Sequence, residues 1–509
     1  MEKVKKIKHF LNKYNLDGYL VPKNDEFFGE YVPEEKDNLK FISNFSGSYG
    51  FALILKSKNY LFVDGRYTLQ ANLQSGKNFQ IVTLPRKLPK DILKNKKMSI
   101  GIDPKLHTDI MLKIFFKNTK CKLVSLDNNL INDIRKKKKV SKFKNFFLLP
   151  NKCVGQSSTS KIEQVSKILN KKSLHLQFVS SSENIAWLLN LRGNDSEYTP
   201  LPNSYLILDN NAKGYLFCDL RKIDSNVVFF KNIKILDISS INLFLSRIKG
   251  KKILIDINTC SIFFKNIIKK HNNIVLDRDP INLFKAIKNK TEIKNTIDSH
   301  LKDGAALTKF LFWVTNNFKR KKITEISAQE KLLGFRKKIK DFKSLSFPTI
   351  SGAGPNGSII HYKAEKKGNR TLKSGEMYLV DSGAQYHYGT TDVTRTISLD
   401  NRNKSIKNIY TRVLKGHIAV SNFKISKHTS GSEIDVVARK SLKEINLDYP
   451  HGTGHGVGYF LNVHEGPHGI SRGNQVTLRE GMIISNEPGY YQNGKFGIRI
   501  ENLITVKKI

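Results

Sequence analysis

Residues 451–468, with the sequence HGTGHGVGYFLNVHEGPH, restrict the fold of this chain more than any other segment. The segment holds four histidines and five glycines within eighteen residues. Glycine destabilises helix and strand interiors, and a histidine in a protein core usually occurs singly. The segment therefore has little value as scaffold and indicates a functional site, the alternative being a polar loop without chemistry.

The length of the chain sets the number of domains. A chain of 509 residues is too long for a single hydrophobic core and predicts about three domains. Apolar runs at 51–55 and 60–63 predict two strands around a polar turn, and they alternate with helical patterns, which is typical of an α/β domain. The basic run 135–139, RKKKK, predicts a solvated helix end or a linker. Because Pro150 follows it, we place the first domain boundary near residue 150.

The remainder of the chain falls into two further segments. Residues 151–284 repeat the coarse order of helices and strands of residues 1–150, as in a duplicated fold, although the sequence identity is too faint to establish duplication. From residue 285 the pattern changes, because 285–318 predicts one long helix, 325–337 predicts another, and glycine-rich loops with short strands follow. The apolar face predicted for the long helix comprises Ile293, Ile297, Leu301, Ala305 and Leu307 to Phe312.

The net charge of +43 is the most unusual bulk property of the chain. Such a charge attracts nucleic acid or anionic lipid, but the lysines are spread along the whole chain without an RNA-recognition signature, so we expect no specific nucleic-acid partner. No apolar run approaches the roughly 20 residues that cross a bilayer, and the N-terminus lacks the apolar core of a signal peptide. We therefore expect a cytoplasmic protein with no membrane partner. The four cysteines are too widely spaced for a metal knuckle and are predicted to be reduced thiols.

Two aspartates lie near one another in a predicted hairpin. The apolar run 377–380 ends in Asp381, and Asp392 follows after a turn at 387–389. A hairpin brings these carboxylates close together, where burial and mutual repulsion both demand a partner.

Two glutamates continue this pattern towards the C-terminus. Glu487 follows an apolar strand, and Glu501 is predicted to lie inside a strand with Arg499 on the same face. Together with the two aspartates and an imidazole such as His455, they form a ligand set of charge −4, which two divalent cations balance. Mixed oxygen and nitrogen ligands suit manganese, cobalt, zinc or iron and do not choose between them.

The order Asp381, Asp392, His455, Glu487 and Glu501 resembles the ligand set of the metallopeptidase family that contains methionine aminopeptidase, prolidase and aminopeptidase P. The segments VDSGAQYHYGTTDVTRT, HGTGHGVGYFLNVHEGPH, NEPGYY and GIRIENL are similar to the Xaa-Pro aminopeptidases of this family, and AWLLNLRGNDSEYTPLPNSYLIL and VDGRYTLQA are similar to their long, three-domain form. This resemblance implies a mixed α/β and α+β fold, with two creatinase-like α/β domains at 1–150 and 151–284 before a pita-bread catalytic domain at 285–509.

The resemblance also implies how the metals are held. Asp381 is expected to bind one metal ion, His455 and Glu487 the other, and Asp392 and Glu501 are expected to bridge the two. Mn²⁺ is the expected cation, with Co²⁺ or Zn²⁺ as alternatives.

Further residues receive expected roles in substrate binding and catalysis. By resemblance, His361 lies on the substrate side, His464 contacts the scissile region, and Glu487 shuttles a proton. His451 supports the substrate from beside the ligands, and Arg499 orients the carboxylate ligands. An apolar pocket must accept the proline ring, and its proposed lining residues are Val463 and Tyr491. By contrast, His387 and His468 are expected to be structural or exposed.

These roles imply a metal-dependent aminopeptidase that releases the N-terminal residue from peptides with proline in the second position. A hydroxide held between the two metals is expected to attack the carbonyl of the first residue and release it, and the enzyme is expected to be a homodimer. Two alternatives remain: an Xaa-Pro dipeptidase, which shares the ligands, and a non-catalytic relative that binds peptides or histones.

Overall fold

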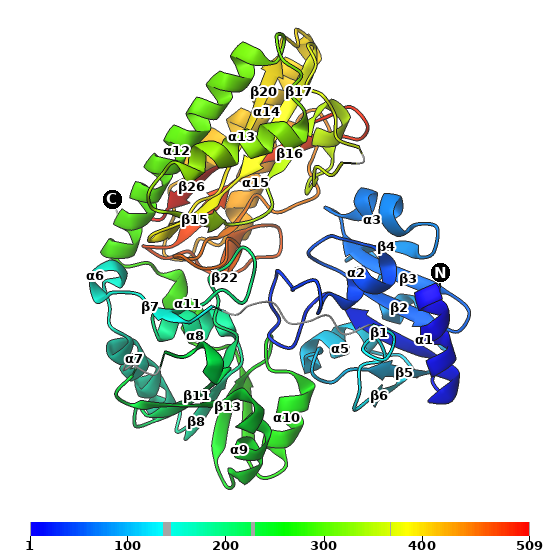
Figure 1. The fold of residues 1–509 in the computed structure, drawn as a ribbon, viewed down its shortest axis with the longest axis vertical. Coiled ribbons are helices and arrows are strands. Elements are labelled where there is room, and N and C mark those ends of the chain that lie inside the picture. Colours follow the sequence, from blue (N-terminus) through cyan, green and yellow to red (C-terminus); the bar gives the residue numbers. More distant parts are fainter. Residues whose placement is uncertain (1, 136–143, 225–229, 367, 508–509) are drawn as a thin grey trace. The chain divides into compact units, whose positions relative to one another are not determined.

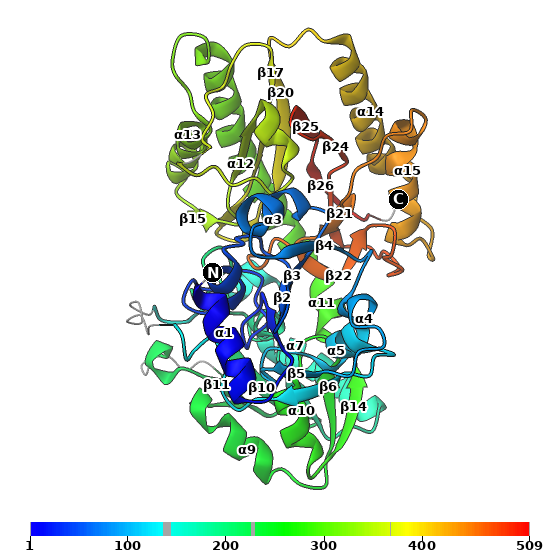
Figure 2. The ribbon, with the colours of Figure 1, turned by 90° about the vertical axis from the view of Figure 1, so that its right-hand side faces the viewer.

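The computed structural model describes residues 2–135, 144–224, 230–366 and 368–507. The chain forms two compact units (Figures 1 and 2). The first comprises Met1–Leu149, Gln156–Glu197 and Leu201–Ile281, and the second comprises Pro150–Gly155, Tyr198–Pro200 and Asn282–Ile509. Apart from Arg135, the basic run 135–139 lies outside the described residues.

The first unit contains two six-stranded mixed sheets with the same topology. Their strand orders are β4-β3-β2-β1-β5-β6 and β12-β11-β10-β8-β13-β14, so corresponding strands take the same places in both. In each sheet the second and third strands form an antiparallel hairpin beside the first, and the outer strands pair in parallel. The repeated order of elements that the sequence predicts is therefore a repeated sheet topology.

The strands of these sheets have short, apolar sequences. Those of the first sheet are β1 (Gly18–Pro22), β2 (Phe51–Leu55), β3 (Asn59–Asp64), β4 (Gln80–Leu84), β5 (Ser99–Ile102) and β6 (Lys122–Ser125). Those of the second are β8 (Leu176–Val179), β10 (Ser204–Asp209), β11 (Gly214–Cys218), β12 (Ile233–Asp237), β13 (Lys252–Asp256) and β14 (Asn273–Asp277), with the separate pair β7 (Phe147–Leu148) and β9 (Leu191–Arg192).

Helices cover both faces of the first sheet. Side chains alternate along a strand, so Ile54 of β2 joins one core with Ile7 and Leu11 of helix α1, while Leu53 joins a second core with Phe115 on the opposite face. Burial on both faces explains why β2 is apolar throughout rather than alternating. The helices of the first unit are α1 (Glu2–Lys13), α2 (Asn38–Ser43), α3 (Thr68–Ser75), α4 (Pro89–Ile92), α5 (Asp109–Phe116), α7 (Ser158–Lys171), α8 (Ser182–Leu188), α9 (Ile241–Arg247), α10 (Ile262–Lys269), α11 (Ile281–Ala286, which runs into the second unit) and the 3₁₀ turns η1 (Leu220–Lys222) and η2 (Ile238–Ser240).

The second unit places its strands between two helix pairs. In Figure 2, α12 and α13 lie on one side of β17 and β20, and α14 and α15 lie on the other. Its helices are α6 (Asn151–Val154), α12 (Lys290–Asn317), α13 (Glu325–Lys337), α14 (Lys404–Ser421), α15 (Gly431–Lys443) and η3 (Gly354–Ser358). Its strands are β15 (Phe342–Leu345), β16 (Ile350–Ala353), β17 (Glu376–Ser382), β18 (Ala384–Tyr386), β19 (Gly389–Thr390), β20 (Val393–Leu399), β21 (Gly454–Gly456), β22 (Glu465–Ile470), β23 (Ile483–Asn486), β24 (Gly489–Gln492), β25 (Phe496–Arg499) and β26 (Asn502–Thr505).

Helix α12 corrects part of the sequence prediction. A capping box between Asn289 and Glu292 fixes its start. The predicted apolar face is wrong at four exposed positions, Ile297, Leu301, Ala305 and Phe312, of which Ile297, Leu301 and Phe312 are 54%, 69% and 70% exposed. The buried face instead includes Asp303, because this carboxylate forms an ion pair inside the unit with a side chain of α13. A polar residue on the inward face of the helix is therefore invisible to a hydrophobic pattern.

Two expectations about the whole chain concern membranes and cysteines. Among the described residues, no helix combines the length and the apolar character needed to span a bilayer. Each of the four cysteines is a free thiol, and three of them are buried: Cys153, Cys218 and Cys260.

Candidate metal centre

The two aspartates lie on a hairpin of the second unit. Strand β17 pairs antiparallel with β20, and Asp381 lies opposite Thr394 in this register. Asp392 comes directly before β20, and the short strands β18 and β19 extend the connection. Both aspartates are buried, at 8% and 4% exposure. The hairpin therefore brings the two carboxylates together, as its spacing predicts.

The two glutamates leave a neighbouring strand pair side by side. In the antiparallel pair of β23 and β26, Asn486 lies opposite Asn502. Glu487 follows the first of these residues and Glu501 precedes the second, so both emerge at the same end of the pair. The predicted position of Glu501 inside a strand is wrong, since it occupies the two-residue break between β25 and β26. His455 belongs to β21, which pairs with β23.

These side chains form one cluster. Ligand atoms of Asp392, His455 and Glu501 lie within 4.8 Å of one another. The His455 Nε2 atom lies 3.4 Å from Asp392 Oδ2 and 3.4 Å from Glu487 Oε1. The structure thus brings together residues that are separated by as many as 120 positions in the sequence, counting from Asp381 to Glu501.

Burial and the mutual repulsion of the carboxylates shift the pKa values of the cluster. Burial raises the pKa of Asp381 to about 6, and repulsion from Asp392 and Glu487 adds to this despite the nearby Arg499. Burial likewise raises the pKa of Glu487 and that of Glu501, the latter well above its usual range with repulsion from the other carboxylates contributing. The pKa of His455 is raised to about 9 although burial opposes this, because Asp392 and Glu487 stabilise the imidazolium ion.

The chemistry of the cluster fits divalent cations. Four carboxyl groups face one another with one imidazole, and the buried Oδ1 atom of Asp381 has no hydrogen-bond partner among the described residues. A buried carboxylate oxygen without a donor is costly unless a cation satisfies it. The donor set is that of a two-metal hydrolytic site. The individual ligand roles remain predictions.

Arg499 connects the cluster to the strands behind it. Its Nη2 atom donates to Asp381 Oδ2 at 2.6 Å, and its Nη1 atom donates to the Tyr491 hydroxyl at 2.5 Å. Its Nε atom donates to Thr394 Oγ1 at 3.2 Å, and Thr394 in turn donates to Glu501 Oε2 at 2.7 Å. Arg499 therefore contacts one carboxylate directly and another through a hydroxyl group. Tyr491, predicted as pocket lining, makes its contact here with a guanidinium group.

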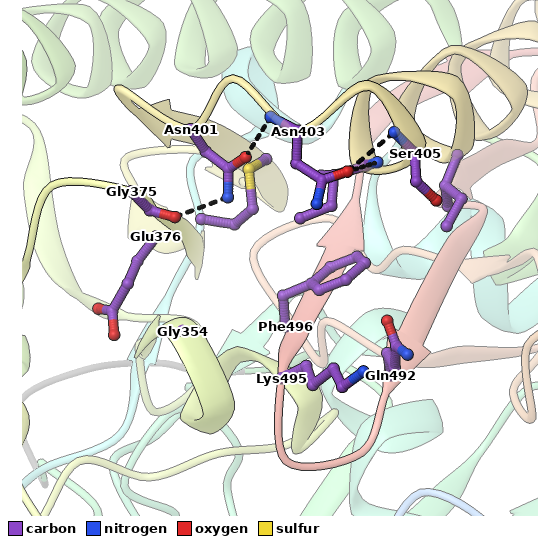
Figure 3. A pocket seen from close by; sticks show the side chains of 12 residues that line it. Gly354, Gly375, Glu376, Asn401, Asn403, Ser405, Gln492, Lys495 and Phe496 are labelled. Carbon is purple, nitrogen blue, oxygen red and sulfur yellow. Dashed lines mark hydrogen bonds between the residues drawn. The ribbon is translucent and has the colours of Figure 1, made fainter.

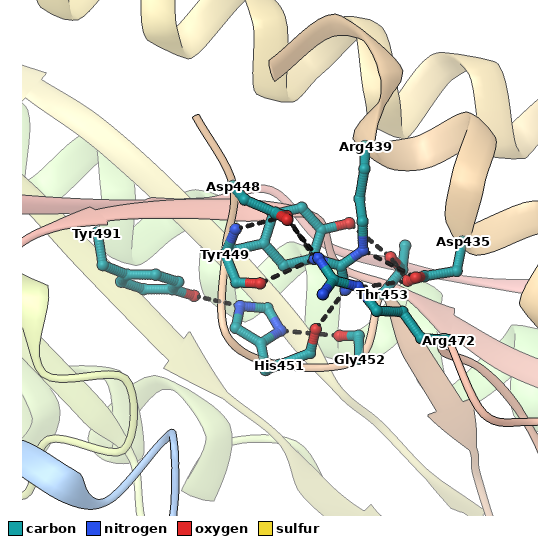
Figure 4. Close-up of polar contacts among 9 residues, drawn as sticks. All are labelled: Asp435, Arg439, Asp448, Tyr449, His451, Gly452, Thr453, Arg472 and Tyr491. Atoms are coloured by element: carbon teal, nitrogen blue, oxygen red, sulfur yellow. Dashed lines mark hydrogen bonds and ion pairs between the residues drawn. The ribbon is translucent and has the colours of Figure 1, made fainter. Parts of the chain in front are cut away.

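The predicted substrate-side histidines lie around this network. His451 Nε2 is 2.9 Å from the Tyr491 hydroxyl (Figure 4). The His464 ring packs edge-on against His455, with ring centroids 4.4 Å apart. His361 follows Ile360, whose carbonyl oxygen accepts a 3.4 Å hydrogen bond from Arg499 Nη2.

Val463 and His468, two further residues of the 451–468 segment with a predicted role or position, are both buried. Val463 is 1% exposed, and its predicted role in the proline pocket stays a prediction. His468 Nε2 lies 2.9 Å from the Ile483 carbonyl oxygen, and burial lowers the pKa of His468 to about 3. A neutral, buried His468 is structural.

A buried ion cluster that no sequence motif predicts lies next to His464 in the chain. Glu465 accepts a hydrogen bond from Lys288 Nζ, and Lys285 Nζ lies 3.8 Å from its other carboxylate oxygen. The three side chains are at most 2% exposed. No local spacing signals this cluster, because Lys285 lies in α11 and Lys288 between α11 and α12, both far from Glu465 in the sequence.

A separate cavity of about 330 Å³ lies beside the hairpin of β24 and β25 (Figure 3). Its lining includes Gln492, Lys495 and Phe496 from this hairpin and Asn403 from the start of α14. None of the predicted site residues lines it.

Comparison with known proteins places the chain among peptidases. The model for metallopeptidase family M24 matches residues 296–508, and models for the creatinase/prolidase N-terminal domain match 3–137 and 137–292. Xaa-Pro aminopeptidase 1 of Dictyostelium discoideum is 39% identical over 538 aligned residues, covering 100% of this chain and 85% of that protein. A probable Xaa-Pro aminopeptidase P of Laccaria bicolor is 38% identical, covering 100% of this chain and 82% of that protein.

Solved structures of X-prolyl aminopeptidase and prolidase are similar to this chain. The crystal structure of X-prolyl aminopeptidase from Caenorhabditis elegans, described as a cytosolic enzyme with a di-nuclear active site, is 31% identical with a TM-score of 0.94, covering 99% of this chain and 87% of that one. Prolidase from Pyrococcus furiosus, at 23% identity and a TM-score of 0.56, shares the fold over 67% of this chain and 96% of its own.

The fold and the matched models define a metallopeptidase with two creatinase-like N-terminal domains followed by a pita-bread catalytic domain. The predicted fold class is therefore confirmed, while the exact boundaries at 150 and 284 stay predictions. Within this class, the chain belongs to the Xaa-Pro aminopeptidases of metallopeptidase family M24.

Proposed function

We propose that the chain is an aminopeptidase that uses two divalent cations to release the N-terminal residue from peptides with proline in the second position. The observation that carries this proposal is the cluster of the buried Asp392 and Glu501 with the partly exposed His455, with Asp381 and Glu487 beside it. The full-length similarity to Xaa-Pro aminopeptidases supports the same substrate class.

The five clustered residues would hold the cations, in the arrangement that the family resemblance implies. When bound, two divalent cations make a water molecule acidic enough to act as a nucleophile near neutral pH and polarise the scissile carbonyl group. Mn²⁺ is the proposed cation. Metal analysis after reconstitution with Mn²⁺, Co²⁺ or Zn²⁺ tests this, and the proposal fails if none of them is retained at close to two ions per chain.

The residues of the chain position the substrate and move protons. His464 packs on the ring of His455, from where its imidazole can donate to the oxygen of the scissile carbonyl group. Glu487, whose Oε1 atom lies 3.4 Å from His455 Nε2, is the group proposed to take a proton from the nucleophile and return it. The proline nitrogen has no hydrogen before cleavage and must gain a proton as it leaves. His361 and His451 are proposed to bind the substrate beside this path.

A peptide-release assay with manganese tests the activity. Arg-Pro-Pro should be cleaved after its first residue much faster than Arg-Ala-Ala. A length series of Xaa-Pro peptides separates the dipeptidase alternative, since an enzyme that cleaves dipeptides alone is not an aminopeptidase. His464→Ala should lose most of its turnover, whereas His428→Ala, at an exposed histidine, should match the unmodified enzyme.

We further propose a cytoplasmic homodimer. The Caenorhabditis elegans relative is described as cytosolic, which supports the location. Ile297, Leu301 and Phe312 form an exposed apolar row on α12, at 54%, 69% and 70% exposure, which suits a contact between two copies. Light scattering of the unmodified protein should give twice the mass of one chain, and Leu301→Glu should lower the measured mass towards that of one chain. A measured mass of one chain for the unmodified protein contradicts the dimer.

A further inference from the structure

The Arg439 side chain of helix α15 donates hydrogen bonds to Asp435 on the same helix and to the loop 448–453 (Figure 4). The residue is 2% exposed. Its Nε and Nη2 atoms donate to the two carboxylate oxygens of Asp435 at 2.8 and 3.0 Å. Its Nη1 atom donates to Asp448 Oδ1 at 2.7 Å and to the Tyr449 carbonyl at 2.8 Å, and Nη2 also donates to the His451 carbonyl at 2.6 Å.

Asp435 extends the contact to the next turn of the loop. Thr453 Oγ1 donates to Asp435 Oδ1 at 2.6 Å, so the hydrogen of this hydroxyl is used there. The Tyr449 hydroxyl, 2.5 Å from Thr453 Oγ1, must therefore donate to it. The ring of Tyr449 also packs against the guanidinium group, 3.9 Å from its centroid. Four consecutive polar contacts thus tie residues 448–453 to one face of α15.

The loop passes this restraint to the candidate metal ligands. The Thr453 carbonyl accepts a 2.8 Å hydrogen bond from the backbone N–H of Glu487. Two residues further on, the His455 N–H donates to Ser485 Oγ at 3.0 Å, and Ser485 Oγ donates to Glu487 Oε1 at 3.0 Å. The carbonyl that Arg439 holds belongs to His451 itself, whose ring contacts Tyr491.

We propose that Arg439 and Asp435 are positioning residues for the metal centre, which set the place of His451 and of the Glu487 carboxylate through the loop 448–453. The inference rests on the proposed two-metal function. An ordinary i, i+4 ion pair that only stabilises α15 needs the Asp435 contacts alone; here the guanidinium group spends three further hydrogen bonds on the loop. Lysine cannot replace it, because a single ammonium group cannot reproduce the planar fork of donors.

Two variants separate positioning from stability. Arg439→Lys keeps the charge but loses the fork, and Thr453→Val keeps the side-chain shape but loses the hydroxyl group between Asp435 and Tyr449. Each should lower kcat and weaken Mn²⁺ binding by roughly 10- to 100-fold, the usual effect of residues that support metal ligands. KM should rise as well, because the loop also holds His451, which is proposed to bind the substrate, so the Mn²⁺ affinity is the readout that reports on the ligands alone. Thr453→Ser, which restores the hydroxyl group, should recover most of the lost kcat.

Arg412→Lys is the matched control. Arg412 also lies in the α14 and α15 pair and donates to a backbone carbonyl, that of Ser441, and to the carboxylate of Glu444, but it does not contact the loop. Its activity and metal binding should equal those of the unmodified enzyme.

Calorimetric titration of the metal-free protein with Mn²⁺, kcat and KM on an Xaa-Pro peptide, and thermal unfolding are measured for every variant. Wild-type kcat and Mn²⁺ affinity in Thr453→Val overturn the proposal, as does a loss that the unfolded fraction accounts for entirely. If Arg439→Lys does not fold, Thr453→Val decides the question. If the unmodified protein binds Mn²⁺ but releases no residue from Xaa-Pro peptides, the proposed function fails, and the Mn²⁺ affinities of the same variants still test the positioning role.

Discussion

Replacing Arg336 with methionine breaks a fully buried ion pair of the second unit. The guanidinium group of Arg336 donates to both carboxylate oxygens of Asp303, at 2.7 and 2.8 Å, and to Ser382 Oγ at 3.1 Å, next to Asp381. Arg336 and Asp303 are 0% and 1% exposed. Removing one partner of such a pair costs about 3–5 kcal/mol, because it leaves an uncompensated buried charge. The Tyr386 hydroxyl still donates to Asp303 at 2.6 Å, so we expect a loss near the lower end, about 3 kcal/mol.

Urea unfolding followed by tryptophan fluorescence measures this loss. The chain has two tryptophans, and Trp313 of α12 reports on the second unit once Trp187 has been replaced by phenylalanine. Adding Asp303→Asn to Arg336→Met removes the stranded charge and should recover part of the stability. Arg412→Met, at a partly exposed pair, should cost no more than about 1 kcal/mol.

The pH dependence of the stability loss in Arg336→Met gives a second check. Arg336 holds the pKa of Asp303 below its usual value against burial, so in the unmodified protein this carboxylate stabilises the fold above its unfolded pKa and loses that effect as the pH falls. Without Arg336, burial raises the pKa of Asp303, and the folded variant takes up a proton. The difference in free energy of unfolding between Arg336→Met and the unmodified protein should therefore become smaller from pH 7 to pH 5. A difference in free energy of unfolding below about 1 kcal/mol at pH 7 refutes the reasoning, and so does a difference that is as large at pH 5 as at pH 7.

Three further outcomes are expected. Lys288→Met should destabilise the protein by about 3 kcal/mol or more in urea unfolding, and adding Glu465→Gln should recover part of this, because Glu465 no longer carries a buried charge. Asp392→Asn should abolish turnover and reduce the bound metal while leaving circular dichroism unchanged; continued release of N-terminal residues from Xaa-Pro peptides contradicts its bridging role. His107 is buried and its pKa is lowered to about 4, so the unfolded chain takes up the proton first and stability falls as the pH drops from 6.5 towards 4. Between pH 7 and pH 4.5 the protonation of His107 in the unfolded chain should lower the free energy of unfolding by about 3 kcal/mol. Urea unfolding at the two pH values measures this loss, and His107→Gln should abolish it.

The parts of the fold that depend on local pattern could be predicted from the sequence. The strand at 51–55 and the helix at 325–337 have the predicted bounds, because runs of apolar residues and helical periodicity are properties of neighbouring residues. The hairpin that joins Asp381 to Asp392 was likewise predictable from the turn between them. The family resemblance supplied the expected role of each ligand, which no periodicity contains.

Contacts between distant residues could not be predicted. Arg336 and Asp303 are 33 positions apart, and Lys288 and Glu465 are 177 apart, so no spacing rule links them. The inward face of α12 was mispredicted for the same reason, since Asp303 is buried by a partner on another helix. Glu501 was placed in a strand because its flanking residues are apolar, whereas the break after Arg499 depends on β26 changing its pairing partner from that of β25.

The second unit also has a consequence for how the protein can be made and divided. Helix α6 lies more than 120 residues before α12 in the chain and supplies carbonyl acceptors to the start of α12 and to the 451–468 segment. Val154 accepts from Asn289 at 2.8 Å, and Cys153 accepts from Asn295 at 3.1 Å and from the Tyr459 hydroxyl at 2.5 Å. During synthesis these acceptors emerge from the ribosome long before their donors. A gene fragment that begins at residue 282 lacks these carbonyl acceptors and leaves their donors unpaired. We therefore expect the second unit to express as a folded protein only when residues 150–155 are supplied with it.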